Sequence, residues 1–569
     1  MVDRDEAFKE VAEHFPEMLS WVLSCYKNQP VLMFGSVVIY SETGFHQGDP
    51  LASLLFSLTL MPIIRIIVQR LPNICVNGWY LDDGGIIGKR EELQEVVDII
   101  LEHGPTKGLI ISTSANSRNP KSTVWCPNAA RADQFGSDPL GRGIPLVRDE
   151  GIVLLGSPIG TVEYERRMLK DRMEKVREIS QRLPLIGDPQ TEYALLRSCL
   201  SLPKLMFTMR TSNPTHHLNM WQEYDSITRD SLCRIMGSSI SDTQWWQATL
   251  PVSAGGLGLR AAEDHCHGAF ISSLLDSHDM KLAILRRSSE ESPLRVTEDM
   301  LQRLAVKTGG EVTIAGLQGS TQKELSTRID AHITQTFLAY TRDSGSTRDM
   351  ARLNSLGLDK AGAWLNVIPS PTLGLHLKSP EFIVCVKYRL GMEIFPTEGQ
   401  CYACPALSDT KGDHAVSCGW GGERIFRHDQ IRDCLFTTCT QACLGPRRED
   451  RALIPGTNAR PADIFLPGWT GGKDTALDVT VINPLQQQFL DQSAVTPGHA
   501  LTRAYARKMG RHGEDCRAAG IVFQPLPLDT LGAWGESTVK EVRKIGSALA
   551  RQTGGEEGEV IRHLVRGYR

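Results

Sequence analysis

The chain has 569 residues, enough for about three to five domains and too many for one small module. Apolar residues make up 41% and charged residues 22% of the sequence, which excludes extensive disorder and fibrous repeats. The 62 Lys and Arg residues against 66 Asp and Glu residues give a formal net charge of -4. No overall basic field therefore points to a nucleic-acid partner, and any such binding must come from local patches.

The N-terminus and the cysteines indicate the cellular compartment. The first twenty residues are rich in charged side chains, which excludes the apolar core of a secretory signal. The 14 cysteines mostly stand alone at irregular spacing, as in intracellular proteins. The most apolar run, Leu51 to Val68, contains Pro62 and Arg65 and predicts a buried helix rather than a membrane span. We therefore expect an intracellular protein with no membrane partner.

The first 160 residues mix helices with short β runs. The valine-rich stretch from Val31 to Tyr40 predicts a strand with a Gly-Ser interruption. The loop from Gly44 to Pro50 ends it, and a helix is expected to open at Leu51. A further helix is expected over about 90 to 103.

Two acidic residues lie between two predicted strands in this segment. The runs Val76 to Tyr80 and Gly84 to Gly88 flank Leu81, Asp82 and Asp83, a pattern typical of a β-hairpin with carboxylates at its tip. Adjacent carboxylates on a rigid turn can hold the divalent metals that nucleotidyl transfer needs. Alone, such a sequence is usually just a turn.

The hairpin gains meaning from what surrounds it. Together with the upstream loop Gln47-Gly48-Asp49-Pro50, it resembles motifs B and C of reverse transcriptases. The segment from Gly108 to Lys121 resembles motif D, and Gly151 to Gly160 resembles the primer-grip region, in the family's order.

The resemblance implies specific roles. Asp82 and Asp83 would bind the catalytic metals, Mg²⁺ or Mn²⁺. Gln47 and Gly48 would shape the template and nucleotide site, and Lys121 would lie near the incoming phosphates.

One element of the family's polymerase site is missing. Polymerases of this family need a further aspartate in motif A, and this chain begins with Met1-Val2-Asp3-Arg4, which resembles only the tail of that motif. Asp3 and Asp5 are poor substitutes because they fall after the family's metal strand. We therefore expect an amino-terminally truncated chain that is deficient as a polymerase.

Helices are expected to dominate the middle of the chain. From 163 to about 235, apolar residues recur three or four positions apart, as in a helical bundle. Its basic face favours solvent exposure, with a phosphate-tracking face as the alternative. The segment 260 to 395 is also mainly helical and carries no chemical motif.

A metal-like group follows at Cys401, Cys404, His414 and Cys418. Three sulfur ligands and one imidazole suit tetrahedral Zn²⁺ in a closed structural site. The alternative is a chance coincidence of buried cysteines and a core histidine. The short spacing of the first pair favours zinc.

Two β runs near the C-terminus each carry an acid. Asp463 opens the first and Asp478 lies in the second, beyond a glycine turn, so neighbouring strands could share one Mg²⁺. Exposed strand-end aspartates are the common alternative. A basic helix follows the strands and favours the functional reading; it carries Arg503, Tyr505, Arg507, Lys508 and His512.

This set resembles the restriction-like endonuclease of site-specific non-LTR retrotransposons, a PD-(D/E)XK relative. The resemblance implies that Glu449, Asp463 and Asp478 are metal ligands. Lys508 would be the catalytic lysine, displaced onto the helix because Thr480 occupies the usual lysine place. The family's Pro-Asp pair is interrupted by Ala462 in this chain.

The order of these parts matches that of retrotransposon reverse transcriptases of the restriction-like-endonuclease class. We expect an α+β multidomain protein: a partial right-hand palm (1–162), a helical thumb (163–245), a helical linker (246–395), a zinc knuckle (396–424) and an α/β nuclease (425–569). The family implies an RNA template, a DNA target, deoxynucleoside triphosphates and a nuclear location. The alternatives are a DNA endonuclease only, or an inactive nucleic-acid-binding remnant.

Overall fold

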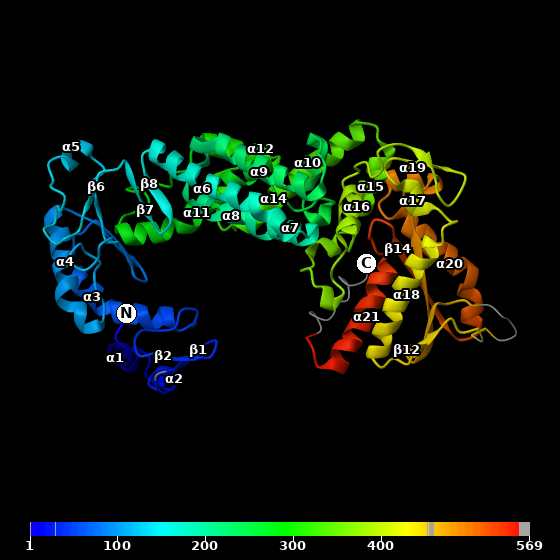
Figure 1. The fold of residues 1–569 in the computed structure, drawn as a ribbon, viewed down its shortest axis with the longest axis horizontal. Coiled ribbons are helices and arrows are strands. Elements are labelled where there is room, and N and C mark those ends of the chain that lie inside the picture. The colour runs from blue at the N-terminus through cyan, green and yellow to red at the C-terminus, as the bar shows by residue number, and fades with distance from the viewer. Residues whose placement is uncertain (1, 29, 452, 455–459, 557–569) are drawn as a thin grey trace. The chain divides into compact units, whose positions relative to one another are not determined.

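The computed structural model describes residues 2–28, 30–451, 453–454 and 460–556 (Figure 1). These residues form two compact units. The first comprises Met1–Asp171 and Ser273–Arg295, and the second comprises Arg172–Ser272 and Val296–Arg569. The chain is mixed α and β, and the expected division into five segments stays a prediction.

The first unit combines helices with two-stranded pairings. Its helices are α1 (Arg4–His14), α2 (Pro16–Tyr26), α3 (Ala52–Arg70), α4 (Arg90–His103) and α5 (Ala129–Ala132). Its strands are β1 (Val31–Phe34), β2 (Val37–Tyr40), β3 (Val76–Tyr80), β4 (Asp83–Ile87), β5 (Val124–Trp125), β6 (Leu146–Val147), β7 (Gly151–Leu154) and β8 (Ser157–Gly160). They pair as β1-β2, β3-β4, β5-β6 and β7-β8, and the described part of this unit holds no larger sheet.

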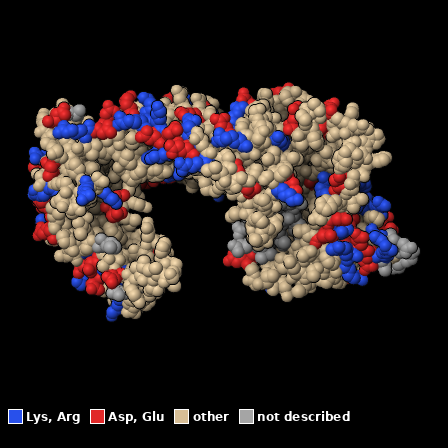
Figure 2. Space-filling model, in the orientation of Figure 1, with Lys and Arg blue, Asp and Glu red and all other residues tan. Residues whose placement is uncertain are grey.

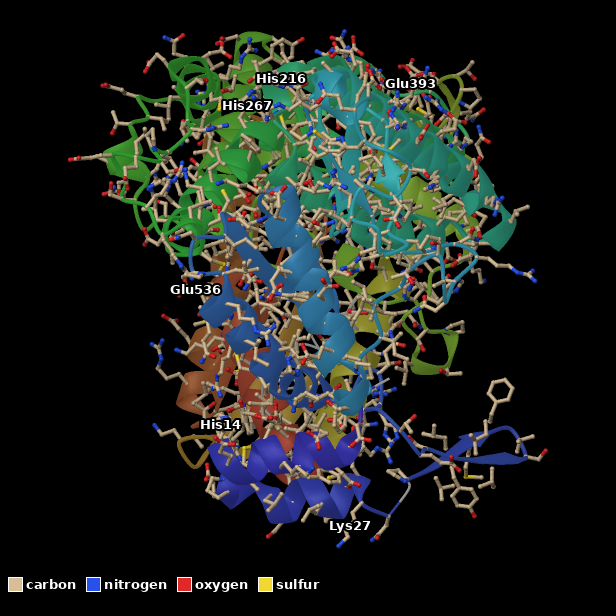
Figure 3. All side chains as sticks on the ribbon, turned by 90° about the vertical axis from the view of Figure 1, so that its left-hand side faces the viewer. His14, Lys27, His216, His267, Glu393 and Glu536 are labelled. Atoms are coloured by element: carbon tan, nitrogen blue, oxygen red, sulfur yellow. The ribbon has the colours of Figure 1, made fainter. Side chains whose placement is uncertain are left out.

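The expected strand from Val31 to Tyr40 is a hairpin. β1 and β2 pair antiparallel with Phe34 opposite Val37, and Gly35 turns the chain with φ +60°. The Gly-Ser interruption is therefore the turn itself, because glycine adopts positive φ without steric cost. Figure 3 shows this hairpin extending away from the helices of its unit.

The helix expected from Leu51 is only half-buried. α3 packs Leu55, Ile63 and Ile67 against α1 and α4, whereas Leu54 and Met61 lie on its exposed side. An apolar run without polar periodicity predicts burial all round, but the neighbouring helices cover one side only. By length and composition alone α3 could cross a membrane, a test that the core helices of many proteins also pass.

The second unit is mainly helical before its sheet, as expected. α6 (Val162–Arg182) and α11 (Ala262–Leu285) run from one unit into the other. The other helices of this part are α7 (Pro189–Leu195), α8 (Leu202–Thr211), α9 (Leu218–Met236), α10 (Asp242–Thr249), α12 (Glu298–Thr308), α13 (Ile314–Leu317), α14 (Gln322–Asp343), α15 (Thr347–Leu356) and α16 (Ser379–Arg389).

A small hairpin and a mixed sheet complete the second unit. The elements are β9 (Gly399–Gln400), β10 (Leu407–Ser408), α17 (Asp413–Ser417), α18 (Glu423–Gln441), β11 (Arg447–Arg448), β12 (Ile464–Thr470), β13 (Lys473–Ile482), α19 (Gln487–Val495), α20 (His499–Ala518), β14 (Val522–Asp529) and α21 (Glu536–Thr553). The strand order is β11-β12-β13-β14; β12 pairs antiparallel with its neighbours, and β13 pairs parallel with β14.

Helices cover both faces of this sheet. α18 and α21 lie side by side and bury the face that carries Leu477 and Val479 (Figure 1). α20 covers the other face, where Phe465 and Phe523 pack against Cys516. The alternation of side chains along a strand divides the residues of β12 and β13 between these two layers.

Candidate functional site

The three acids near the C-terminus occupy neighbouring positions across the sheet. Arg448 pairs with Ile464, and Ile464 pairs with Leu477. Extending both registers by one residue places Glu449 beside Asp463 and Asp463 beside Asp478. The Glu449 amide donates to the Asp463 carbonyl at 3.0 Å, which confirms the first step.

Asp478 is buried and bonded to the predicted lysine. Only 6% of its surface is exposed, and the Lys508 ammonium lies 2.9 Å from its Oδ2 and 3.0 Å from its Oδ1. Burial raises the pKa of Asp478 to about 6, although the Lys508 charge opposes this rise. The resemblance implied a catalytic lysine on this helix, and the structure places Lys508 beside Asp478.

Asp463 is held by two donors at the start of β12. The Val479 amide donates to its Oδ2 at 2.7 Å, and His428 Nε2 lies 3.2 Å from the same atom. The hydrogen bond to Asp463 is the main cause that raises the pKa of His428 to about 9. Sequence reasoning missed His428, because its place beside Asp463 arises only when α18 packs on the sheet.

Glu449 is more open than the two aspartates. Arg432 Nη1 lies 2.5 Å from its Oε1, and Arg460 Nη1 lies 3.1 Å from its Oε2. Its backbone φ is +44°, which is uncommon for a residue other than glycine. Arg432 also contacts Asp429 and Asp433, so it links α18 to this end of the sheet.

These carboxylates supply the oxygen ligands that Mg²⁺ prefers. In the described part of the chain, however, their oxygens do not form a group of three within 4.8 Å of one another. Glu449 is paired with two arginines at the outer edge, whereas Asp463 acts electrostatically on Asp478. The three acids therefore occupy neighbouring strand positions, with Glu449 held by arginines at the edge of the sheet.

The predicted zinc ligands converge. The ligand atoms of Cys401, Cys404, His414 and Cys418 all lie within 4.8 Å of one another. Cys401 Sγ is 3.9 Å from Cys418 Sγ, and Cys404 Sγ is 3.3 Å from His414 Nε2. Three thiols and an imidazole at this spacing fit tetrahedral Zn²⁺.

Local structure positions these four residues. The β9-β10 pairing brings the first two cysteines together on one hairpin, and α17 presents the histidine. Asp409 accepts hydrogen bonds from the Asp413 and His414 amides at 3.0 and 2.7 Å. Arg348 of α15 holds Asp413 through Nε at 2.5 Å and Nη2 at 2.7 Å, which fastens the knuckle to the helical region.

The carboxylate hairpin of the first unit is present as predicted. Tyr80 pairs with Asp83 across β3 and β4, and Leu81 has φ +55° in the two-residue turn. Asp82 and Asp83 are exposed at this tip. Among the described residues, neither belongs to a group of three ligand side chains within 4.8 Å.

The other candidate polymerase residues lie on exposed loops. Gln47 and Gly48 are exposed in the turn before α3, and Gly48 has φ +96°. Lys121 has an exposed side chain, and its amide donates to Ser112 Oγ at 3.0 Å. No hydrogen bond or ion pair between described residues joins Lys121 to Asp82.

Arg4 and Tyr26 organise the loop before α3 and were not predicted as site residues. Arg4 Nε donates to the Gly44 carbonyl at 2.8 Å, and Arg4 Nη1 donates to the Tyr26 carbonyl at 3.2 Å. The Tyr26 hydroxyl bonds to Asp49, whose Oδ1 accepts from the Leu51 amide at 2.8 Å. Asp3 caps α1 by accepting from the Glu6 amide, a structural role.

Comparison with known proteins relates the chain to mobile elements. No family model matches it. It is 23% identical over 264 residues to the retrotransposable element SLACS 132 kDa protein of Trypanosoma brucei gambiense. The match covers 46% of this chain and 20% of that protein, so the chain matches about a fifth of the relative's length. This distant similarity supports, at most, a relation to retrotransposon proteins.

Proposed function

We propose that the second unit contains a metal-dependent DNA endonuclease within a retrotransposon-derived protein. The observation that carries this proposal is the row of Glu449, Asp463 and Asp478 across neighbouring strands, with Lys508 bonded to Asp478. The β-strand order and the helical crossover between β13 and β14 also agree with the resemblance to PD-(D/E)XK nucleases.

The chemistry would divide between the acids and the lysine. Mg²⁺ or Mn²⁺ held by Asp463 and Asp478, with Glu449 at the edge, would polarise a phosphodiester and activate water. Lys508 Nζ lies beside Asp478, where it could donate to a phosphate oxygen or orient a water. The Val479 amide and His428 fix the orientation of the Asp463 carboxylate.

A supercoiled-plasmid assay tests this proposal. The folded chain should convert the plasmid to the open-circular form with Mg²⁺, and Asp463→Asn and Asp478→Asn should each abolish this conversion. The asparagine variants keep the shape of the side chain, and circular dichroism would show that they fold. A wild type that never nicks, or nicking that persists in both variants, would refute the assignment.

We further propose that the first unit derives from a reverse-transcriptase palm. The exposed Asp82 and Asp83 on a tight hairpin and the braced loop containing Gln47 and Gly48 support this reading. The parent activity would be target-primed reverse transcription, in which a nick in target DNA primes the copying of an RNA template from deoxynucleoside triphosphates. The protein would carry out this activity in the nucleus.

The Cys401, Cys404, His414 and Cys418 group is proposed to hold one structural Zn²⁺. Four protein ligands close the coordination sphere, so the metal would stabilise the knuckle and not take part in hydrolysis. An inactive nucleic-acid-binding remnant is the alternative function for the whole chain. DNA binding without any nicking in the plasmid assay would favour it.

A further inference from the structure

α20 carries a row of three arginines beside the candidate nuclease site. Arg503, Arg507 and Arg511 are spaced four residues apart, so they follow one side of the helix at intervals of roughly 6 Å. All three are exposed, and none forms an ion pair with another described residue. We call these three residues the arginine ridge.

The ridge passes next to Lys508. Arg507 precedes that lysine, and Arg511 lies three residues after it, within one helical turn. Lys508 points to Asp478, whereas Leu501, Ala504 and Cys516 pack the helix onto the sheet. The ridge therefore borders the side of α20 from which Lys508 reaches Asp478.

The arginine ridge and Gly510 lower the stability of α20 as a helix. Like charges four residues apart repel, and the ridge contains two such pairs. Gly510 lies within the same helix, and a Cβ there would meet nothing within 4 Å, so packing among the described residues does not require a glycine. Glycine inside a helix is destabilising relative to alanine. Helix stability thus explains neither the repeated arginines nor the glycine.

A polyanion lying along the ridge accounts for both features. Small side chains at Thr502, Ala506 and Gly510 flank the arginines and let a phosphate backbone approach the helix closely. α20 carries five Lys and Arg residues against two acids, in a chain of net charge -4. Figure 2 shows Lys and Arg side chains, with some acids, over the part of the second unit where Figure 1 draws α20.

We infer that the arginine ridge is the surface that binds the backbone of duplex DNA and guides it to the carboxylates. This inference rests on the proposed endonuclease and names its substrate surface. The arginines contact phosphates and not base edges, so they contribute affinity without reading sequence. They are positioning residues, and the chemistry belongs to the acids and Lys508.

The test measures binding of the full chain to a fluorescently labelled DNA duplex, without added Mg²⁺, over a range of salt concentrations. Replacing the ridge by alanine (Arg503→Ala, Arg507→Ala, Arg511→Ala) should weaken binding by about 10-fold or more. The plot of log K against log salt has a negative slope, and its magnitude should decrease by roughly 2 to 3, because each lost phosphate contact removes about 0.9. The corresponding triple lysine variant should keep most of the affinity.

The matched control removes the same charge from the helix on the other face of the sheet. Lys540, Arg543 and Arg551 of α21 are exposed, and their triple alanine variant should bind like wild type. Equal binding by wild type and the ridge variant, or equal loss in both triple variants, would overturn the inference. A ridge variant that loses RNA binding but keeps its affinity for duplex DNA would also overturn the inference.

Plasmid nicking separates this inference from the proposed function. At saturating DNA the ridge variant should nick at nearly the wild-type rate, and at low DNA it should nick more slowly. Nicking that needs Asp478 but is unaffected by the ridge at any DNA concentration would refute the ridge alone. Ridge-dependent binding by a wild type that never nicks would refute the nuclease and leave the DNA-binding surface.

Discussion

At the scale of single residues, Asp529 shows how a buried acid links stability to pH. It lies at the end of β14 with 6% of its surface exposed, and its Oδ1 accepts from the Leu531 and Ala533 amides at 2.9 and 2.8 Å. The Ser355 hydroxyl bonds to its other oxygen. Burial nevertheless raises the pKa of Asp529 to about 6. The acid ties α15 to the sheet at the cost of desolvating a carboxylate.

This shift predicts a pH-dependent difference between wild type and Asp529→Asn. Because the pKa is raised, the folded state binds the proton more tightly than the unfolded state does. The contribution of Asp529 to the free energy of unfolding is therefore full below about pH 4 and is lost as pH rises through about 6. The free energy of unfolding of wild type minus that of the variant should decrease by roughly 3 kcal/mol or less as pH rises across that range. Urea unfolding at several pH values would measure it, and a constant difference would contradict the shift.

The candidate site depends on contacts that short-range patterns do not encode. Turn residues, strand periodicity and a basic helix locate Asp463, Asp478 and Lys508 in the sequence, and their roles as ligands and catalytic lysine were implied by the resemblance to restriction-like endonucleases. His428 and Arg432 were missed, since they meet the acids only through the packing of α18 on the sheet.

At the scale of elements, one buried arginine joins three separate segments of the helical region. Arg389 of α16 is 2% exposed and donates through Nε to Gly256 at 3.0 Å, through Nη1 to Ala361 at 3.1 Å and through Nη2 to Val252 at 2.6 Å. All three acceptors are backbone carbonyls: Val252 and Gly256 lie in one turn that includes a short 3-10 helix, and Ala361 lies in another turn. Burial lowers the pKa of Arg389 to about 10.

Replacing this arginine by methionine should destabilise the chain strongly. Arg389→Met would leave the Gly256 and Ala361 carbonyls without a donor, whereas the Val252 carbonyl would keep the Gly255 amide at 3.3 Å. Losing such a buried network costs about 3 to 5 kcal/mol. The midpoint of urea unfolding should fall accordingly. Arg551→Met on the exposed side of α21 is the control and should change it little. Equal midpoints for the two variants would show that the Arg389 contacts contribute nothing.

The knuckle makes a separate prediction about metal. Purified chain should contain about one zinc per molecule if Cys401, Cys404, His414 and Cys418 form the one closed site that we propose. Chelation or Cys418→Ser should lower the thermal unfolding temperature, since metal binding contributes directly to folding. Cys385→Ser, at an exposed cysteine outside the group, is the matched control. Metal-free purified protein, together with unchanged stability of Cys418→Ser, would show that these four residues hold no structural metal.

Element-scale predictions from sequence succeeded where the pattern was local. The β3-β4 hairpin, α4 and the β12-β13 pair lie where turn residues and apolar periodicity put them. The stretch from Val31 to Tyr40 is β structure as expected, but it folds as a hairpin. The prediction that α3 is buried was wrong on one side of the helix, because whether an apolar segment is covered depends on what packs against it. Eight apolar residues of β1 and β2 are exposed, which no local pattern predicts.

At the scale of the whole molecule, the two units carry different expectations for activity. The first has two exposed aspartates on the isolated β3-β4 pair, which places no further acid beside them in the described chain, whereas the second sets Glu449, Asp463 and Asp478 on neighbouring strand positions. Two-metal transfer loses several kcal/mol of transition-state stabilisation without its full ligand set. The purified chain should therefore not extend a primer on an RNA template with Mg²⁺ or Mn²⁺. Extension that disappears in an Asp82→Asn, Asp83→Asn double variant would contradict this.

The proposed nuclease site is tested most sharply by the single-turnover rate of plasmid nicking with Mg²⁺ in two variants of strand β13. Asp478→Asn removes a buried acid beside Lys508, whereas Asp474→Asn removes an exposed acid four residues earlier on β13. We expect Asp474→Asn to nick at the wild-type rate and folded Asp478→Asn to nick at least about 100-fold more slowly. Equal rates for the two variants would contradict a nuclease site at Asp478.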